Sequence, residues 1–179
     1  MTLKEFSETW RARAALLQDR ALKDRLGVVA ANEVSAMVKR RVFFDGIAID
    51  GTQIGQYSTR PAYFSTDQPG LPKISPKGKT KRAKKTRYSE TGYAGFRRLV
   101  GRQNAHVDLN LTGATFRGCG VGVNASNFPA FGIKTKEATA RIDGNEKRFG
   151  KIILTPNAIE REAGRSAALR ELQYILNIR

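Results

Sequence analysis

The residues best able to do acid–base or metal chemistry are few and lie far apart in the sequence. His106 is the only histidine and Cys119 the only cysteine, so they cannot form a zinc site of the usual composition. Asp45, Asp50 and Asp108 could bind magnesium for phosphoryl transfer, but isolated aspartates of this kind are more typical of turns. We therefore expect no catalytic residue, no metal site and no cofactor.

Glycine-containing stretches also lack the context that catalysis or nucleotide binding requires. In GCGVGVN, from Gly118 to Asn124, the glycines alternate within a strand-like segment and no amphipathic helix follows directly. Close backbone packing or a bulge explains such glycines better than a dinucleotide site. GATFRG does not have the strand–serine–helix order of a nucleophile elbow, and no Walker-type phosphate loop is present. The sequence thus predicts a protein that is not an enzyme.

One stretch of the sequence is strongly cationic. PKGKTKRAKKTRY, from Pro76 to Tyr88, contains seven lysines and arginines and no acid, in a chain whose net charge is +16. Charge of this size is typical of proteins with polyanionic surroundings, such as nucleic acid, an anionic membrane face or acidic partner proteins. The predicted contact residues are Lys77, Lys79, Lys81, Arg82, Lys84, Lys85 and Arg87.

Three interpretations of this cationic segment stay open. It could follow a phosphate backbone, dock on an acidic protein face, or be a solvated loop. No aromatic residues are interleaved among its charges, as they are in single-strand binders, and no common DNA- or RNA-binding signature accompanies it. Recognition of specific bases is therefore not expected.

The N-terminal part of the chain is predicted to be helical. Residues 2–41 have apolar spacings of three and four, and Gly27 predicts a break, because glycine in a helix interior costs about 1 kcal/mol relative to alanine. We expect the apolar side of the first helix to pack against the rest of the protein. Its members are Leu3, Phe6, Trp10, Ala14 and Leu17.

The middle of the chain combines turns, a long loop and a short helix. The Asp-Gly pairs at 45–46 and 50–51 predict turns that use positive φ at glycine. Residues 56–88 are rich in proline and lysine and are predicted to form a long loop without regular central strands. Residues 89–101 predict a short helix with Ser89 as its N-cap.

Short strands are expected after this helix. HVDLNLTG, residues 106–113, alternates apolar and polar positions as a half-buried strand does, and residues 115–124 predict a second strand. Two further strands, at 137–142 and 148–154, are expected on either side of the Asp-Gly-Asn sequence at 143–145. The fold class that follows is α+β, with a small antiparallel β-sheet packed against N-terminal and C-terminal helices and a long basic loop.

The predicted organisation is a single domain over residues 1–179. It comprises a helical N-terminal region (1–41), the long loop (56–88), the short helix and strands (89–154) and a C-terminal helix (155–179), with Thr155 as N-cap and Pro156 in the first turn. The N-terminal sequence has no apolar core of a secretory signal, and no apolar run approaches the roughly 20 residues that cross a bilayer. We expect a protein of a reducing aqueous compartment.

An ordered series of motifs resembles a known family. VSAMVKRRVFFDG, IDGTQIGQYS, GYAGFRRLVGRQ and VDLNLTGATFRG follow one another as in neck proteins of tailed bacteriophages, the tail-completion or virion-morphogenesis group of head–tail connectors. KRFGKIILTPNAIERE is similar to the closing strand and C-terminal helix of that family. The likeness spans residues 28–176, and the loop at 56–88 departs from it. The positions that carry it are Arg40, Arg41, Phe43, Asp50, Gly51, Leu111, Thr112 and Gly113.

This resemblance implies a structural subunit of the virion, assembled in the host cytoplasm. Six or twelve copies would form a ring between the portal–adaptor assembly and the tail, in contact with other neck and tail proteins and with no membrane. The cationic segment would meet either genomic DNA in the lumen or an acidic face of an adjacent ring, and we favour protein docking slightly. The alternative function is a non-specific nucleic-acid-binding basic protein, ribosomal-like or DNA-associated.

Deletion of Lys77 to Arg87 is expected to leave the fold intact, because a surface loop contributes little to the core. Circular dichroism and thermal unfolding of the deletion variant measure this. Loss of the cooperative unfolding transition contradicts the assignment of a loop.

Overall fold

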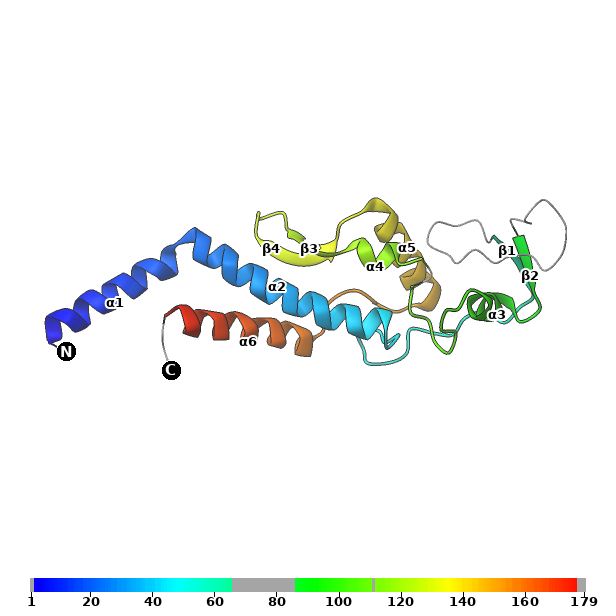
Figure 1. Ribbon diagram of the computed structural model, residues 1–179, viewed down its shortest axis with the longest axis horizontal. Coiled ribbons are helices and arrows are strands. Elements are labelled where there is room, and N and C mark those ends of the chain that lie inside the picture. Colours follow the sequence, from blue (N-terminus) through cyan, green and yellow to red (C-terminus); the bar gives the residue numbers. More distant parts are fainter. Residues whose placement is uncertain (1, 66–85, 111, 177–179) are drawn as a thin grey trace. The chain divides into compact units, whose positions relative to one another are not determined.

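The computed structural model describes residues 2–65, 86–110 and 112–176 (Figure 1). Within these ranges it contains six α-helices and two small antiparallel sheets of two strands each, which confirms the predicted α+β class. Internal packing divides the chain into two compact units. Unit 1 comprises residues 1–38, 119–134 and 156–179, and unit 2 comprises residues 39–118 and 135–155. The single-domain organisation stays a prediction.

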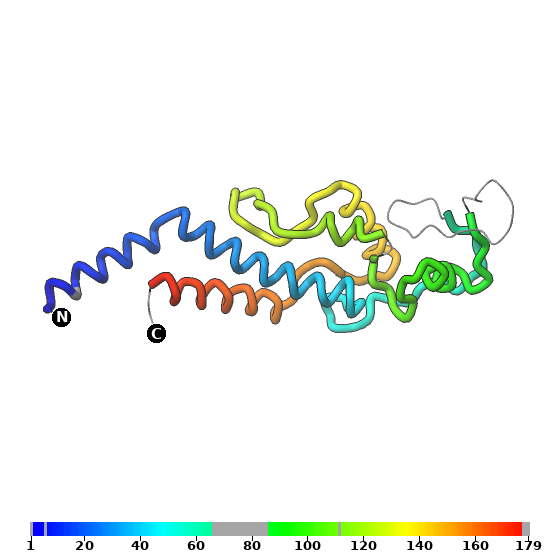
Figure 2. Tube along the Cα trace, in the orientation of Figure 1, coloured from blue at the N-terminus to red at the C-terminus, as the bar shows by residue number. Residues whose placement is uncertain are grey.

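Unit 1 is built around the long helix α2 (Arg20–Phe43), whose last residues belong to unit 2. Helix α6 (Ala158–Ile175) lies along one side of α2, and the antiparallel ribbon of β3 (Cys119–Val123) and β4 (Pro129–Ile133) lies along the other (Figures 1 and 2). Cys119 at the start of β3 is buried. The ribbon confirms the strand-like character of the alternating glycines.

Two helical glycines allow the close packing of unit 1. A Cβ at Gly164 of α6 would lie 2.7 Å from Cγ2 of Val34 and 3.1 Å from the carbonyl oxygen of Ala30, both on α2. A Cβ at Gly27 of α2 would lie 2.7 Å from the ring of Phe128, which joins β3 to β4. Gly27 therefore sits within a continuous helix, and the predicted break at this residue is wrong.

The break between the N-terminal helices falls instead at Asp19, between α1 (Leu3–Gln18) and α2. Asp19 has an extended backbone, and its carboxylate accepts a 2.9 Å hydrogen bond from the N–H of Ala21, which satisfies one donor of the new helix. The start of α1 is fixed by a capping box. The Thr2 hydroxyl accepts from the Glu5 N–H and the Glu5 carboxylate accepts from the Thr2 N–H.

The apolar side of α1 does not pack against the chain, which corrects the expectation of a buried stripe. Leu3 is 89% exposed, Trp10 50% and Leu17 45%. In Figures 1 and 2, α1 extends away from the N-terminal end of α2, without a second helix or strand of unit 1 alongside it. The amphipathic spacing of α1 is therefore real, but these side chains stay largely exposed.

Unit 2 contains β1 (Ala62–Ser65), β2 (Thr86–Ser89), α3 (Gly92–Leu99), α4 (Ala114–Arg117) and α5 (Lys136–Phe149). Strands β1 and β2 pair antiparallel, from Ala62 opposite Ser89 to Ser65 opposite Thr86. Short strands therefore occupy positions 62–65 and 86–89, and the predicted loop 56–88 is wrong at these positions. Both Asp-Gly turns are confirmed, with positive φ at Gly46 and Gly51.

Strand β2 begins at Thr86 and includes Arg87. The deletion that tests the cationic segment should therefore run from Lys77 to Lys85, so that β2 is kept.

Several predicted strands are corrected by the structure. Residues 106–110 and 112–113 are irregular, because both Val107 and Asp108 are buried and Leu109 has a φ of 54°, which ends any alternation. Residues 137–142 lie in helix α5, which Thr135 caps by accepting the N–H of Ala138 at 3.2 Å. The Asp-Gly-Asn sequence lies inside this helix and forms no turn between strands.

Three further boundaries differ from the sequence prediction. Residues 148–154 form the end of α5 and an irregular segment after the left-handed cap Gly150, not a strand. The short helix predicted over 89–101 is confirmed as α3, but its N-cap position is Thr91. The C-terminal helix is confirmed as α6, which Asn157 and Glu160 begin with a capping box in place of Thr155 and Pro156.

Among the helices of the described ranges, none combines the length and apolar character needed to cross a bilayer.

Two glycine-to-alanine substitutions are expected to have opposite effects on stability. Gly164→Ala should lower the free energy of unfolding by about 1–2 kcal/mol, because the added methyl meets Val34 and backbone of α2. Gly144→Ala, in α5 with open space around it, should raise it by roughly 0.5–1 kcal/mol through helix propensity. Denaturant unfolding followed by circular dichroism measures both. Equal effects of the two substitutions contradict the close α2–α6 packing.

Candidate functional site

The predicted contact residues fall mostly outside the described part of the chain. Lys77, Lys79, Lys81, Arg82, Lys84 and Lys85 lie within residues 66–85, which the structure does not describe. Arg87 is described: it lies in β2, opposite Phe64 of β1, and is half-buried. The proposed contacts of these cations with DNA or protein therefore stay a prediction.

The ribbon of β1 and β2 adds an aromatic surface that the sequence did not suggest. Tyr63 and Tyr88 are paired across the two strands, with ring centroids 5.0 Å apart, and they are 74% and 50% exposed. Only Tyr88 adjoins the cationic segment in sequence, whereas Tyr63 comes from the other strand. Two exposed rings therefore lie side by side on β1 and β2, the strands that flank residues 66–85 in the sequence.

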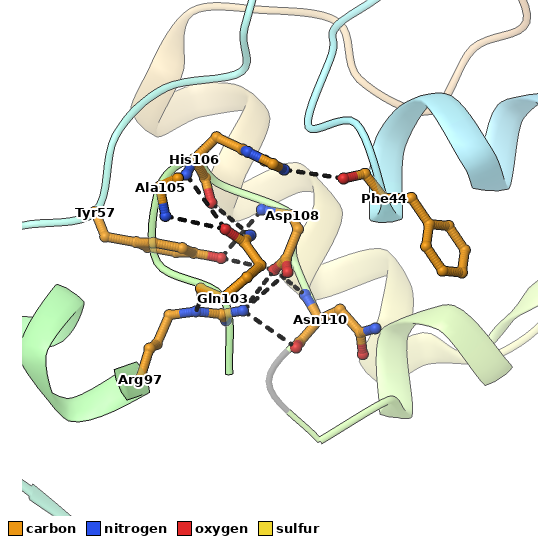
Figure 3. Close-up of polar contacts among 8 residues, drawn as sticks. All are labelled: Phe44, Tyr57, Arg97, Gln103, Ala105, His106, Asp108 and Asn110. Atoms are coloured by element: carbon orange, nitrogen blue, oxygen red, sulfur yellow. Dashed lines mark hydrogen bonds and ion pairs between the residues drawn. The ribbon is translucent and has the colours of Figure 1, made fainter. Parts of the chain in front are cut away.

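A buried ion pair in unit 2 joins Arg97 of helix α3 to Asp108 (Figure 3). Nη2 of Arg97, on α3, is 2.9 Å from each carboxylate oxygen of Asp108, and the two side chains are only 1% and 6% exposed. The N–H of Asn110 donates a third hydrogen bond to Asp108 Oδ1 at 2.9 Å. These hydrogen bonds offset the desolvation cost of burying the two charges, so the ion pair is tolerated in the interior.

Tyr57 completes this cluster from the preceding loop. Its hydroxyl donates to Asp108 Oδ1 at 2.8 Å and accepts from the Asp108 N–H at 3.0 Å, while its ring lies 4.4 Å from the Arg97 guanidinium. Burial of the phenol, together with the nearby Asp108 charge, raises the pKa of Tyr57 far above its usual value. Tyr57 therefore donates to Asp108 as a neutral phenol.

His106 has a structural position beside this cluster. Its Nε2 lies 3.0 Å from the carbonyl oxygen of Phe44, so the Nε2–H donates to a main-chain acceptor (Figure 3). Gln103 organises the same segment through two hydrogen bonds. Its side-chain amide donates to the main-chain carbonyl of His106 at 2.8 Å, and its main-chain carbonyl accepts from Arg97 Nε at 2.6 Å. His106 therefore does not lie in a strand, as predicted for residues 106–113, because this segment forms a hydrogen-bonded irregular loop.

Arg41, one of the residues that carry the family resemblance, is a second buried arginine. Its guanidinium donates to the carbonyl oxygens of Ile47 and Ile153 at 3.0 Å and of Thr155 at 3.1 Å. The side chain is thus fixed within unit 2 and holds two distant segments together. Its position in the motif reflects the fold and does not indicate an exposed contact residue.

A cavity of about 360 Å³ lies next to the buried ion pair, within unit 2. Side chains of the loop at 57, strand β1, helix α3, the segment 107–115 and helix α5 surround it. The lining residues are Tyr57, Phe64, Ser65, Tyr93, Phe96, Arg97, Val107, Leu109, Thr112, Ala114, Thr115, Arg141, Asn145, Arg148 and Phe149. Burial raises the pKa of Tyr93, so this lining phenol is also neutral.

The described lining of this cavity is cationic: it includes three arginines and no carboxylate. Arg97 is neutralised by Asp108, and Arg141 is paired at 2.7 Å with Glu137, an exposed pair of little energetic weight. Arg148 contacts the ring of Phe149, with its guanidinium 5.2 Å from the ring centroid, and has no ion pair within the described residues. Among the described residues, Arg148 is therefore the cation of the α5 rim that no carboxylate neutralises.

The carboxylates that could have bound a metal ion are dispersed. Within the described ranges, no group of three or more His, Cys, Asp or Glu residues is placed to hold a metal. Asp108 is committed to Arg97, and Asp50 closes its own turn by accepting from the hydroxyl and N–H of Thr52, bonds that lower its pKa.

Sequence reasoning did not find this cavity. Arg141, Asn145 and Arg148 recur at spacings of four and three, which is one face of a helix, but the segment was interpreted as two strands and a turn. The helical start signal, Thr135 with Glu137 in the first turn, was available in the sequence.

No family model, curated protein or solved structure matches the chain.

Removal of one partner of the buried ion pair is expected to be strongly destabilising. Arg97→Met should lower the free energy of unfolding by about 3–5 kcal/mol, because Asp108 would remain charged and buried without its cation. Arg165→Met, which breaks an exposed pair with Glu162, should change stability little. Denaturant unfolding measures both.

The double variant Arg97→Met/Asp108→Leu tests the reason for this effect. It should recover part of the lost stability, because no unpaired charge is left in the interior. A double variant that is less stable than Arg97→Met alone contradicts the interpretation.

Proposed function

We propose that this protein is a structural, non-enzymatic subunit of the head–tail interface of a tailed-bacteriophage virion. In this role six or twelve copies form a ring in the neck, between the portal–adaptor assembly and the tail. The motif series described above supports the family, and the dispersed acidic groups of the described residues support a binding role over a catalytic one.

The observation that carries the proposal is the exposed apolar side of α1. Leu3, Trp10 and Leu17 of α1 are 89%, 50% and 45% exposed. Their spacing of seven residues places them on one stripe of the helix, and exposure of such an apolar stripe to water is energetically unfavourable. Exposed apolar residues continue on α6, at Ile159 and Tyr174. Burial of such surfaces in a subunit interface is the ordinary way in which an assembly protein satisfies them.

The charge of the chain supports assembly with other molecules. At +16, identical copies repel one another unless anionic groups lie nearby. In a neck ring these groups would be genomic DNA in the lumen or acidic faces of adjacent rings. A cationic, oligomeric component of a larger particle agrees with both the exposed stripe and the net charge.

A non-specific nucleic-acid-binding protein is the second candidate. The exposed Tyr63–Tyr88 pair favours it, because aromatic rings beside a cationic segment can stack with bases while the cations meet phosphates. Under this alternative, association with nucleic acid would not require a ring.

Oligomer formation is expected to depend on the apolar stripe of α1. The purified protein should form rings at rising concentration, and Trp10→Ser/Leu17→Ser should shift the population to monomers, with an unchanged circular dichroism spectrum because both residues are exposed. Mass photometry and negative-stain microscopy measure the distribution.

The matched control is Leu99→Ser, an equally exposed leucine on α3 of unit 2 (51%), which should leave the rings intact. A protein that stays strictly monomeric and binds RNA tightly, with a steep dependence on salt, contradicts the neck role and supports the second candidate.

A further inference from the structure

The cavity of unit 2 presents apolar surface to an open concave space. Phe96 and Val107 at its floor are fully buried, whereas Phe64, Tyr93 and Leu109 are only partly covered by the rest of the chain. A volume of about 360 Å³ is at the lower end of ligand pockets, which run from roughly 300 to 1,000 Å³. It suits one large side chain and its neighbouring backbone, and it is too small for a duplex or a globular surface.

The charge of the rim selects the kind of segment that enters. Arg141 and Arg148 project from one face of α5, and the described lining contains no carboxylate. Arginine clusters at the edge of an apolar pocket attract acidic motifs, because each guanidinium can donate two hydrogen bonds to one carboxylate. A basic or neutral segment would gain nothing from this rim.

The aromatic residues of the cavity do not offer the open ring faces that nucleic-acid bases use for stacking. Phe64 stacks on Phe96, with centroids 5.0 Å apart and an interplanar angle of 22°. Tyr57 has Arg97 over its ring at 4.4 Å and meets Tyr93 edge to face. Because these rings already pack on one another, the site favours a peptide over a single-stranded nucleic acid.

We infer that this cavity binds an acidic peptide segment of a neighbouring protein. The segment inserts one aromatic or large aliphatic side chain against the partly covered Phe64, Tyr93 and Leu109. It places a carboxylate at Arg148, with Arg141 as the second cation. The inference rests on the proposed function, since the neck role supplies the adjacent proteins on which a ring docks. It identifies their chemistry at this site: an apolar anchor flanked by aspartate or glutamate.

A short peptide tests the site on the full-length chain. Acetyl-Asp-Phe-Asp-amide is titrated into ¹⁵N-labelled protein, and amide chemical shifts are followed. Perturbations are expected in residues that line the cavity, with a dissociation constant on the order of 1 mM for so small a probe. Acetyl-Lys-Phe-Lys-amide and acetyl-Asp-Ala-Asp-amide should each bind at least about threefold more weakly, because one loses the charge and the other the anchor.

Matched variants separate the rim from the general charge of the protein. Arg148→Gln should weaken binding of the acidic peptide about three- to tenfold. Lys147→Gln, an exposed neighbour on α5 outside the lining with the same change of charge, should leave it unchanged. Both variants are expected to keep the spectrum of the folded protein, because both side chains are exposed.

Three results overturn the inference: no shift of the lining residues at about 10 mM acidic peptide, equal binding of the lysine peptide, or tighter binding of the dinucleotide thymidylyl-thymidine at the same residues. None of them bears on ring formation, which is measured separately by particle mass. Conversely, peptide binding by a protein that forms no rings would retain the acidic-segment site and reject the neck role.

Discussion

The contact between Arg97 and Asp108 is the constraint on which the arrangement of unit 2 depends. A buried carboxylate that accepts from a guanidinium, a phenol and a backbone N–H brings α3, the loop at Tyr57 and the segment that ends at Asn110 to one point. The segment cannot also form a strand ladder, since its polar groups are used in this cluster. Arg97 of this pair also lines the cavity, and Asp108 neutralises its charge. Whatever enters the cavity therefore meets the cations of α5 and not the charge below them.

The two units carry different kinds of surface. Unit 1 presents uncovered apolar side chains along α1 and α6, whereas unit 2 presents exposed tyrosines and the cationic cavity rim. Apolar surfaces give binding energy that depends little on salt, while charged surfaces give orientation and rates of association that depend strongly on it. A subunit that must first join its copies and then meet a different, acidic component would use the two kinds of surface in these two steps.

The helices that carry strong local signals were predictable, and the irregular segments were not. The helical N-terminal region, the Asp-Gly turns and the final amphipathic segment each depend on neighbouring residues, so they were predictable from the sequence. Gly27 was misread because its role is contact with Phe128, which lies far away in the chain. HVDLNLTG was misread because its alternation is overridden by a tertiary ion pair between residues 97 and 108, which no local period encodes. The helix over residues 137–142 has a recognisable N-cap in Thr135, but Asp143-Gly144-Asn145 was interpreted as a turn between two strands.

Burial of Cys119 at the start of β3 has a practical consequence. Because it is the single native thiol and is shielded, maleimide reagents have no exposed natural target on the folded protein. A cysteine placed on the outer face of β1 or along α1 would be the reactive one. Fluorophores or spin labels attached there would report distances between copies, or between a copy and DNA, without prior removal of the native residue.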